Sequence, residues 1–181
     1  VCKLVQGLPL AILQAAGWTN DFTCVDIYAS VQENLDFLTT NAPDLPEQHR
    51  SMRAMFEYSW SMLSPHEQQV LMQVAVFRGD FNRKAALAIT DANLSDLLIL
   101  TNKSLLEQPA PGIYRMHELL RQFAEKLTDV GQRQAYCRRH AEFYLELLHI
   151  QGSALSSTDV ANAIHEVKFA LDNIRQAWDW T

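Results

Sequence analysis

Two His-Glu pairs are the residues of this sequence whose spacing comes nearest to a catalytic motif. His117-Glu118 and His165-Glu166 match the first half of H-E-x-x-H, in which two histidines one helical turn apart hold zinc and the glutamate acts as a base. The second histidine is missing in both places. The pairs are therefore not expected to form a metal site.

Another pair of histidines and the three cysteines also lack the spacing of a metal or redox centre. His140 and His149 are nine residues apart. That is roughly 2.5 helical turns, so we expect them on opposite sides of a helix, in solvent or at the edge of the core. Cys2, Cys24 and Cys137 form no C-x-x-C pair, which excludes zinc and thioredoxin-like sites. Scattered cysteines in an acidic chain are typical of small buried side chains in a reducing cytoplasm, so we expect a cytoplasmic protein.

The sequence also lacks the motifs of nucleophilic and phosphate chemistry. It contains no G-x-x-x-x-G-K-[ST] phosphate loop, no G-x-S-x-G elbow and no G-x-G-x-x-G fingerprint. Its carboxylates are dispersed, and no two of them stand out as an acid and base couple. We therefore predict no catalytic residues, and the chain alone is not expected to be an enzyme.

The composition is that of a folded protein with a core of its own. The 181 residues are 48% hydrophobic and 20% charged, with a formal net charge of −6. This apolar fraction excludes disordered, collagen-like and disulfide-built chains. No apolar run approaches the length of a membrane span, and Val1 opens no signal peptide. The absent initiator Met and the helix-like start suggest a piece of a longer chain.

Helical signals dominate the first 50 residues. Residues 1–18 read as a helix interrupted at Gly7, with a new helix beginning at Pro9, because proline suits the first turn of a helix and not its interior. A second helix is predicted over 23–40. The two prolines and polar flanks of 41–48 mark a linker.

From Ser51 to about residue 103 the pattern predicts four further helices. An amphipathic stripe begins at Ser51, and the next helix starts with the capping box of Ser64-Pro65-His66-Glu67. Gly79 is expected to end that helix and Asn82 to cap the following one. The last helix begins at Asn93 or Ser95 and is expected to have one apolar side, formed by Leu94, Leu97, Leu98 and Thr101.

After residue 103 the hydrophobic pattern changes from that of a helix to that of strands, and it returns to that of a helix after residue 116. Residues 104–108 and 113–116 read as a β-hairpin around a Pro-Ala-Pro-Gly turn, and a helix resumes at once. Helices followed by a two-stranded hairpin are the order of a winged-helix module. The remainder, 131–181, is predicted to form one antiparallel helix pair joined through Gly152-Ser153 and 156–158, the beginning of a helical-repeat array. Its expected apolar faces are Ala141, Tyr144, Leu145 and Leu148, and Ile164, Val167, Leu171, Ile174 and Trp178.

A winged helix raises DNA binding as an alternative, which the charges argue against. Residues 44–126 carry nine basic and ten acidic side chains. Affinity for DNA rests on clustered Lys and Arg, and this segment has no excess of them. The expected recognition helix, 94–103, has five Leu or Ile residues and one base. This composition indicates that the helix is buried and does not read the edges of DNA bases.

Three stretches, in order, resemble the C-terminal part of the nucleotide-binding module of STAND-class signalling ATPases, the NB-ARC group, in its bacterial regulator form. Gly7-Leu8-Pro9-Leu10 matches the GLPL motif of the helical subdomain that follows the ATPase core. Residues 45–81 resemble the start of the family's winged-helix domain. Residues 115–121, RMHELLR, match the MHD-type motif between the wing and the last helix. The tail, 163–180, resembles the opening of the superhelical repeats that commonly follow.

The resemblance implies nucleotide-binding roles for Pro9 and His117 in a full-length parent. In the family, the proline packs near the adenine and ribose, and the histidine contacts the β-phosphate of ADP and holds the module closed. An imidazole at a helix N-terminus can donate to a phosphate, helped by the helix dipole. The alternative interpretation is that Pro9 only starts a helix and that His117 only caps one.

The sequence departs from the family pattern at three points. Glu118 replaces the Asp of the motif, and Asp80 replaces a second Gly that often follows the Phe-Arg-Gly run. The phosphate loop and its metal-binding acid are absent from the 181 residues. The resemblance therefore implies ADP or ATP as a cofactor of the parent, while the chain alone should neither hydrolyse ATP nor bind it tightly.

We predict a mainly α fold with a helical subdomain over 1–45, a winged-helix domain with a small β-hairpin wing over 46–128, and the start of TPR-like repeats over 129–181. The expected function is that of the regulatory fragment of a nucleotide-controlled switch that senses ADP through His117. Its expected partners are the P-loop ATPase core of the same parent and proteins bound by the repeats. Binding to nucleic acid or to a membrane is not expected. One alternative is a protein-binding helical scaffold. The other is a DNA-binding winged helix of a transcription regulator, with these side chains at the phosphates: Arg83, Lys84, Lys103 and Arg115.

Overall fold

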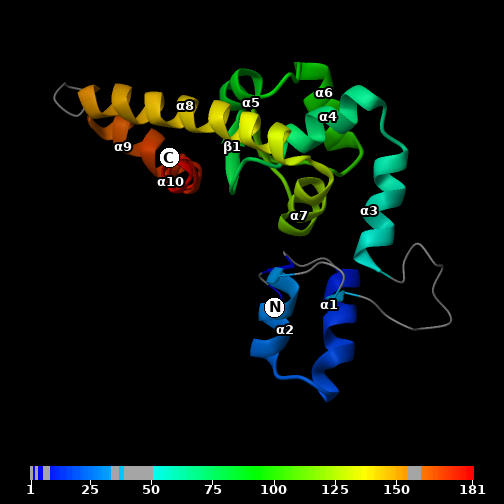
Figure 1. Cartoon of the computed structure of the whole chain (residues 1–181). Coiled ribbons are helices and arrows are strands. Elements are labelled where there is room, and N and C mark those ends of the chain that lie inside the picture. Colours follow the sequence, from blue (N-terminus) through cyan, green and yellow to red (C-terminus); the bar gives the residue numbers. More distant parts are fainter. Residues whose placement is uncertain (1, 3, 6–8, 34–36, 39–50, 155–159) are drawn as a thin grey trace. The chain divides into compact units, whose positions relative to one another are not determined.

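The protein is mainly helical, with one small three-stranded antiparallel sheet, as predicted (Figure 1). The computed structural model describes residues 2, 4–5, 9–33, 37–38, 51–154 and 160–181. These fall into two compact units, one formed by 1–68 with 117–123 and the other by 69–116 with 124–181. No helix in the described part is both long and apolar enough to cross a membrane. The three-domain division stays a prediction, and its first boundary falls outside the described residues.

The first unit begins with two short helices and a 3-10 turn. Helix α1 runs from Pro9 to Gly17, η1 from Trp18 to Asn20 and α2 from Cys24 to Glu33. The helix start at Pro9 is confirmed. Helix α2 ends before the expected residue 40, and Leu38 lies outside any helix. The carbonyls of Phe37 and Leu38 bond outside a helix. The Phe37 carbonyl accepts from Trp18 Nε1 at 3.1 Å, and the Leu38 carbonyl accepts from the Met52 N–H at 3.2 Å.

The expectations of a short first helix and of buried cysteines are wrong. Cys2, Leu4 and Val5 lie in turns rather than in a short helix. So few residues before Gly7 gain too few hydrogen bonds to offset helix nucleation. The cysteines are free but not buried, since Cys2 and Cys24 are exposed and Cys137 is half-buried. Gly7, Leu8 and the linker 41–48 lie outside the described residues.

A serine caps each of the next two helices, and the capping box predicted at Ser64 is confirmed. Helix α3, Met52–Ser61, has Ser51 as its N-cap. Helix α4, Pro65–Val74, begins with the predicted capping box, in which the Ser64 N–H donates to the Glu67 carboxylate at 2.6 Å. The helix ends at Val74 and not at Gly79. Gly79 instead has a φ of 67°, in the turn that leads into the sheet, where glycine is favoured because it has no Cβ.

The second unit contains the strand–helix–helix–hairpin order of a winged helix. Strand β1, Asp80–Asn82, is followed by α5, Arg83–Ile89, and α6, Leu94–Asn102. Strands β2, Glu107–Ala110, and β3, Ile113–Arg115, form the wing, and the sheet order is β1-β3-β2. The sequence prediction missed β1, which is three residues long and too short to show an alternating pattern.

Helix α6 buries only part of the apolar side that the sequence predicted. Asn93 caps it in a capping box with Asp96. Leu97 and Leu100 are fully buried, whereas Leu94 is 53% exposed and Leu98 57% exposed. The expectation that Leu94 and Leu98 face the core of the chain is therefore wrong. The residues that face inward are three apart, so the buried stripe is narrower than the run of leucines.

The C-terminal part has more helices than the one pair that was predicted. Helix α7 spans Glu118–Leu127 and α8 Val130–Ala154, so α8 runs through Gly152 and Ser153, where a loop was expected. Helices α9, Val160–Phe169, and α10, Leu171–Trp180, follow. Residues 156–158 lie outside the described residues. The buried side of α9 and α10 is formed by small residues, one isoleucine and one asparagine: Ala163, Ala170, Ala177, Ile174 and Asn173. Three side chains expected to face inward are exposed: Ile164, Leu171 and Trp178.

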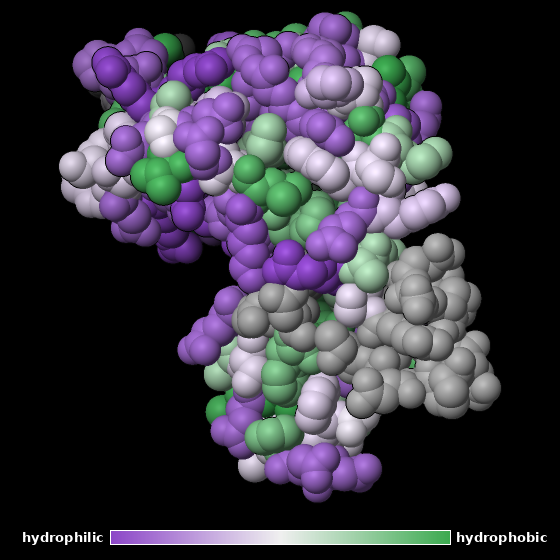
Figure 2. All heavy atoms as spheres, turned by 45° about the vertical axis from the view of Figure 1, so that its right-hand side comes forward, coloured by the Kyte–Doolittle hydropathy of each residue, from purple (hydrophilic) through white to green (hydrophobic). Residues whose placement is uncertain are grey.

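An aromatic cluster fills the core between the sheet and α8. Phe77 and Phe81 stack with ring centroids 4.1 Å apart, and Phe81 also faces Tyr114 across the sheet. His140 and Tyr144 close the cluster from α8, with centroids 4.7 Å apart. His140 is 1% exposed, so its expected place in solvent or at the core edge is wrong. Outside this core, the face of the molecule in Figure 2 is mostly hydrophilic, with small separate hydrophobic groups.

Candidate functional site

His117 lies where the sequence predicted it, between the last strand of the wing and the next helix. It follows β3 by two residues and immediately precedes Glu118, the first residue of α7. Its carbonyl accepts the Arg121 N–H at 2.9 Å, and its Nδ1 accepts the Leu119 N–H at 3.1 Å. The bond from Arg121 is the first hydrogen bond of the helix ladder, and the bond from Leu119 satisfies an N–H group that the first turn of a helix leaves without a partner. His117 is therefore the N-cap of α7.

The capping bond decides which ring nitrogen of His117 carries the proton. Because Nδ1 accepts a hydrogen bond from the backbone, the hydrogen of a neutral ring lies on Nε2. That nitrogen is 2.9 Å from the carbonyl oxygen of Val5, within the same unit. His117 thus presents an N–H donor, at a helix N-terminus, to the segment that leads into the GLPL motif.

Glu118, the acidic residue of the MHD-type motif, bonds to side chains of its own helix, α7. The Glu118 carboxylate accepts two hydrogen bonds from the Arg121 guanidinium, at 2.6 and 2.7 Å, and a third from Gln122 Nε2 at 3.1 Å. The Arg121 side chain is only 10% exposed. A bidentate pair of this kind fixes both side chains. The longer side chain of Glu, compared with the Asp of the family motif, is therefore used within the first turn of α7.

Pro9, the second predicted site residue, is the first residue of α1 and is exposed. The hydrogen bond from His117 reaches Val5, four residues before Pro9 in the sequence. The structure therefore connects His117 with the segment before Pro9, while no contact between the two side chains is described. The two structural roles, helix start and helix cap, are both observed, and the nucleotide role stays a prediction for both residues.

An ion pair holds the strand that leads to His117. Asp80 and Arg115 are opposite each other in the register of β1 and β3. Their side chains form a bidentate pair, with Arg115 Nη2 at 2.9 Å from Asp80 Oδ2. The hydrogen bond to Asp80 raises the pKa of the Arg115 guanidinium. The Asp that replaces a glycine of the family pattern thus has a definite partner on the strand ending two residues before His117.

A buried asparagine joins the last helix to the turn before β1. Asn173 of α10 accepts the Arg78 N–H at 2.8 Å and donates to the Asp80 carbonyl at 2.9 Å. Its side chain therefore bonds to both ends of the Arg78–Asp80 turn. Gly79, in the middle, leaves room for α10, because a Cβ there would lie 3.3 Å from Asp172 Oδ2. We call this arrangement the Asn173 joint.

His140 completes the Asn173 joint from α8. Its Nε2 lies 3.1 Å from the same Asn173 oxygen that accepts the Arg78 N–H. The orientation of the amide is fixed by its two backbone partners, so His140 must be the donor. Burial lowers the pKa of His140 from 6.5 to about 4, and the hydrogen bond that His140 donates to Asn173 opposes this shift only in part. His140 is therefore neutral at physiological pH.

Sequence reasoning did not find Asn173, His140 or Val5. For Asn173 a signal existed, because it is a polar residue at helical spacing from Ala170 and Ala177 on one apolar stripe. His140 precedes the apolar Ala141 of the face that was recognised on α8 and could have been included in it. Val5 contributes only its backbone carbonyl, which no residue pattern reveals.

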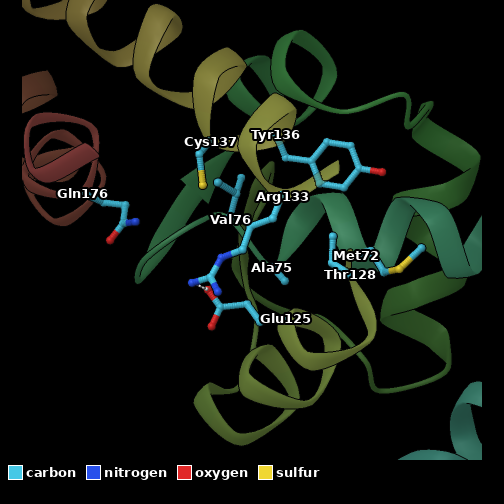
Figure 3. Close-up of a pocket in the computed structure, with 9 residues that line it drawn as sticks. All are labelled: Met72, Ala75, Val76, Glu125, Thr128, Arg133, Tyr136, Cys137 and Gln176. Carbon is cyan, nitrogen blue, oxygen red and sulfur yellow. Dashed lines mark hydrogen bonds and ion pairs between the residues drawn. The ribbon is translucent and has the colours of Figure 1, made fainter. Parts of the chain in front are cut away.

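The hollow in Figure 3 is too small to be a ligand site. It lies between α8, α10 and the end of α4, and Cys137 points toward it. Its free volume is about 20 Å³, which is room for about one water molecule. Arg133 and Glu125 close one side with an ion pair of 3.5 Å. Among the described residues, no group of three or more His, Cys, Asp or Glu side chains could hold a metal ion.

Comparisons with known proteins connect the chain to bacterial regulators. No protein-family model matches it. Over its whole length it is 25% identical to a Mycobacterium tuberculosis protein named as an HTH-type transcriptional regulator, of which it spans 22%. Over 76% of its length it is 31% identical to the regulatory protein AfsR of Streptomyces griseus and 29% identical to AfsR of Streptomyces coelicolor, and it spans 15% of each.

Among solved structures, the chain is similar to a STAND protein with a tetratricopeptide repeat sensor from Pyrococcus horikoshii. The match covers 90% of this chain and 28% of the other, with a TM-score of 0.47 and 17% identity. The chain spans about a fifth or less of the length of the curated relatives named above. It is thus similar to one part of several longer bacterial regulatory proteins.

Proposed function

We propose that this chain is the regulatory part of a nucleotide-controlled signalling switch and that His117 senses bound ADP in the full-length parent. The observation that carries the proposal is the geometry of His117. Its capping bond through Nδ1 leaves Nε2–H as a donor, and the Val5 carbonyl accepts from it at 2.9 Å. A phosphate oxygen is a stronger acceptor than a carbonyl, and a helix N-terminus favours negative charge.

The two roles of His117 support each other in this mechanism. Capping uses one ring nitrogen and fixes the ring plane, so that the donor on the other nitrogen needs no reorganisation to meet a phosphate. Loss of the phosphate would return Nε2–H to a protein acceptor such as the Val5 carbonyl. A switch needs two alternative partners for one group, and the described contact supplies one of them.

Helix α6 provides an apolar surface for the ATPase core that the proposal places elsewhere in the parent. Leu94 and Leu98 are more than half exposed on one side of α6 and Leu87 of α5 is 41% exposed. Leu94 and Leu98 are one helical turn apart, and neighbouring exposed leucines of this kind are typical of protein interfaces. A helix that reads DNA instead presents polar donors at this position.

The Asn173 joint offers a route by which the repeats could act on the sensor. Asn173 bonds to the backbone on both sides of Gly79, and the Asp80 side chain holds Arg115 on the neighbouring strand. Arg115 is two residues before His117 in the chain. Displacing α10 would therefore disturb the turn, the ion pair and the strand that ends at the sensor.

The test is ADP release from the full-length parent, followed with a fluorescent ADP analogue. His117→Ala should speed release by about ten- to a hundredfold, the range expected for one hydrogen bond to a charged group, and should raise basal signalling. His165→Ala is the matched control, because His165 is an exposed histidine. An unchanged release rate in His117→Ala would remove this residue from the mechanism. Equal acceleration in both variants would indicate a general loss of structure.

DNA binding is the second candidate, favoured by the name of the mycobacterial relatives. That name belongs to proteins of which this chain is about a fifth. Of the four cations expected at the phosphates, Arg115 is committed to Asp80. A mobility-shift assay at about 50 and 200 mM salt separates the candidates, since tight and steeply salt-dependent binding by the chain would favour DNA.

The third candidate, a helical protein scaffold without nucleotide control, makes a different prediction about the parent. The switch requires a phosphate loop upstream of Val1, and the scaffold does not. Reading the coding sequence upstream of Val1 distinguishes the two. A parent without a phosphate loop would overturn the switch and leave the scaffold.

A further inference from the structure

An open groove lies along α8, far in sequence from the sensor histidine. It is bounded by α8, by Glu166 of α9 and by Asn82 and Lys84 at the start of α5, all within the second unit. Helix α9 runs alongside α8 there (Figure 1). The free volume is about 410 Å³, enough for several side chains. Neither the proposed nucleotide sensor nor the Asn173 joint uses this groove.

The floor of the groove is an apolar stripe on one face of α8. Phe143, Leu147 and Ile150 recur at i, i+4 and i+7, the spacing of one helix face. Phe143 and Leu147 are half-buried, and Ile150 is 53% exposed. Exposed apolar side chains on the wall of a concave surface indicate an interaction site more strongly than the same side chains on a convex one.

The rim of the groove is acidic. Glu142, Glu146 and Glu166 line it, and among the described residues that line the groove Lys84 is the one cation. Glu142 already pairs with Arg138 at 2.9 Å, but both side chains are more than 60% exposed, so that pair is weak. Within the described part of the chain, Glu146 and Glu166 have no ion-pair partner. Two carboxylates are therefore available beside an apolar floor.

We propose that this groove binds a basic amphipathic helix of a partner protein. Apolar side chains spaced one turn apart would cover Leu147 and Ile150, and Lys or Arg side chains beside them would meet Glu146 and Glu166. This is helix-in-groove recognition, in which apolar anchors give affinity and complementary charges give orientation. The inference deepens the proposed role of the helices as the receiver of a protein signal. It rests on that role but not on nucleotide control.

The charge of the rim decides between this partner and other occupants. An anionic ligand such as a nucleotide or a nucleic acid would be repelled by the carboxylates. A second copy of the chain would bring its own net charge of −6 to an acidic rim. A cationic helix gains from both the floor and the rim, so the chemistry of the groove favours it.

The probe is a fluorescein-labelled Leu/Lys peptide of about 18 residues, long enough for an amphipathic helix, titrated with the chain and read by fluorescence anisotropy. Two peptides test pattern and charge separately: a scrambled Leu/Lys sequence of the same composition and a Leu/Glu peptide with the original stripe. We expect saturable binding of the patterned Leu/Lys peptide, weaker at high salt, and at least about tenfold weaker binding of the other two. Equal binding of the scrambled peptide would overturn the proposal, because it would indicate attraction by net charge alone.

Variants locate the binding on the chain. Glu146→Lys with Glu166→Lys should weaken binding at least about tenfold, and Ile150→Asp should weaken it by removing an apolar anchor. Glu57→Lys with Asp21→Lys is the matched control, since it makes the same change in net charge at exposed positions of the first unit. Equal loss in the control pair would exclude the groove. Concentration-dependent dimerisation of the unliganded chain that Ile150→Asp abolishes would instead identify a second copy as the occupant and overturn the proposal. Because the ADP-release test concerns His117 alone, either proposal can fail without the other.

Discussion

His140 Nε2 lies 3.1 Å from Asn173 Oδ1, and the same oxygen accepts the Arg78 N–H at 2.8 Å. One amide oxygen therefore joins α8, α10 and the turn before β1. The ring of His140 also stands edge-on to Phe77, with centroids 5.7 Å apart, and the positive charge of Arg78 further disfavours its protonated form. A neutral imidazole satisfies the arrangement, whereas a charged one would be buried without a carboxylate partner.

Acidification should destabilise the second unit through His140. Burial lowers the pKa of His140 from 6.5 to about 4 in the folded state. Between these values the unfolded chain binds more protons, so stability is fully present above pH 6.5 and is lost as the pH falls toward 4. The loss attributable to this residue is about 3 kcal/mol, at 1.36 kcal/mol per pKa unit. Urea unfolding between pH 4.5 and 7.5 measures it.

The variant His140→Gln separates this contribution from that of the carboxylates. Glutamine keeps an N–H donor for Asn173 but does not titrate, so the free energy of unfolding should depend less on pH than in the unmodified chain. His165→Gln, at an exposed histidine, is the control for the exchange of an imidazole for an amide. Parallel pH curves for the chain and His140→Gln would contradict the assignment.

Removing the amide of Asn173 should be among the most destabilising single changes in the second unit. In Asn173→Ala the Arg78 N–H and the Asp80 carbonyl lose their partner, and each buried group left without one costs roughly 1–3 kcal/mol. We expect a total loss of about 2–5 kcal/mol by urea unfolding. Arg175→Ala, in the same helix, is the control, because its side chain is 68% exposed. A loss below about 1 kcal/mol would show that the joint contributes little.

The glycine of the joint should be less replaceable than the glycine of the wing turn. Gly79 and Gly112 both have positive φ, 67° and 77°, so alanine costs about 1 kcal/mol at either position through the backbone. At Gly79 a new Cβ would also lie 3.3 Å from Asp172 Oδ2, whereas at Gly112 the nearest atom is the flexible end of Arg83 at 3.7 Å.

Thermal unfolding of the two alanine variants measures the difference. Gly79→Ala should be the more destabilising, and Asp172→Ala in the same chain should recover the part due to crowding. Gly152→Ala should stabilise by roughly 0.5–1 kcal/mol, because Gly152 is helical and has nothing within 4 Å of the added carbon. Equal losses at Gly79 and Gly112 would show that α10 yields freely to the new side chain.

The elements that the sequence predicted well are those specified locally. Capping boxes at Ser64 and Asn93 mark their helices because the side chains bond within three residues. The wing was found because its change of period is continuous in sequence, although its first strand covers Glu107–Ala110 and not the expected 104–108. The position of His117 followed from the same hairpin and helix boundary. For such features, a window of about ten residues contains the whole interaction.

The features that were missed depend on residues far apart in the sequence. Strand β1 is too short for a pattern and is a strand because it pairs with β3. The burial of His140 depends on Asn173, 33 residues away. Leu94 and Leu98 were assigned to the core because they are leucines, yet the buried side of α6 is decided by what packs on it. The prediction that the cysteines are buried was wrong for the same reason, because residue type alone does not decide what packs on a side chain.

Alkylation should distinguish Cys137 from the two other cysteines. Burial raises the pKa of the Cys137 thiol, although the nearby Arg133 opposes this, so less of the reactive thiolate is present near neutral pH. Cys2 and Cys24 are exposed. In the folded chain at pH 7.5, iodoacetamide should therefore modify Cys137 on the order of tenfold more slowly, as measured by mass spectrometry of digests over time. In urea the three rates should converge, since the difference comes from the fold and not from neighbours in the sequence. If Cys137 reacted in the folded chain as fast as Cys24, the hollow of Figure 3 would have to open readily between α8 and α10.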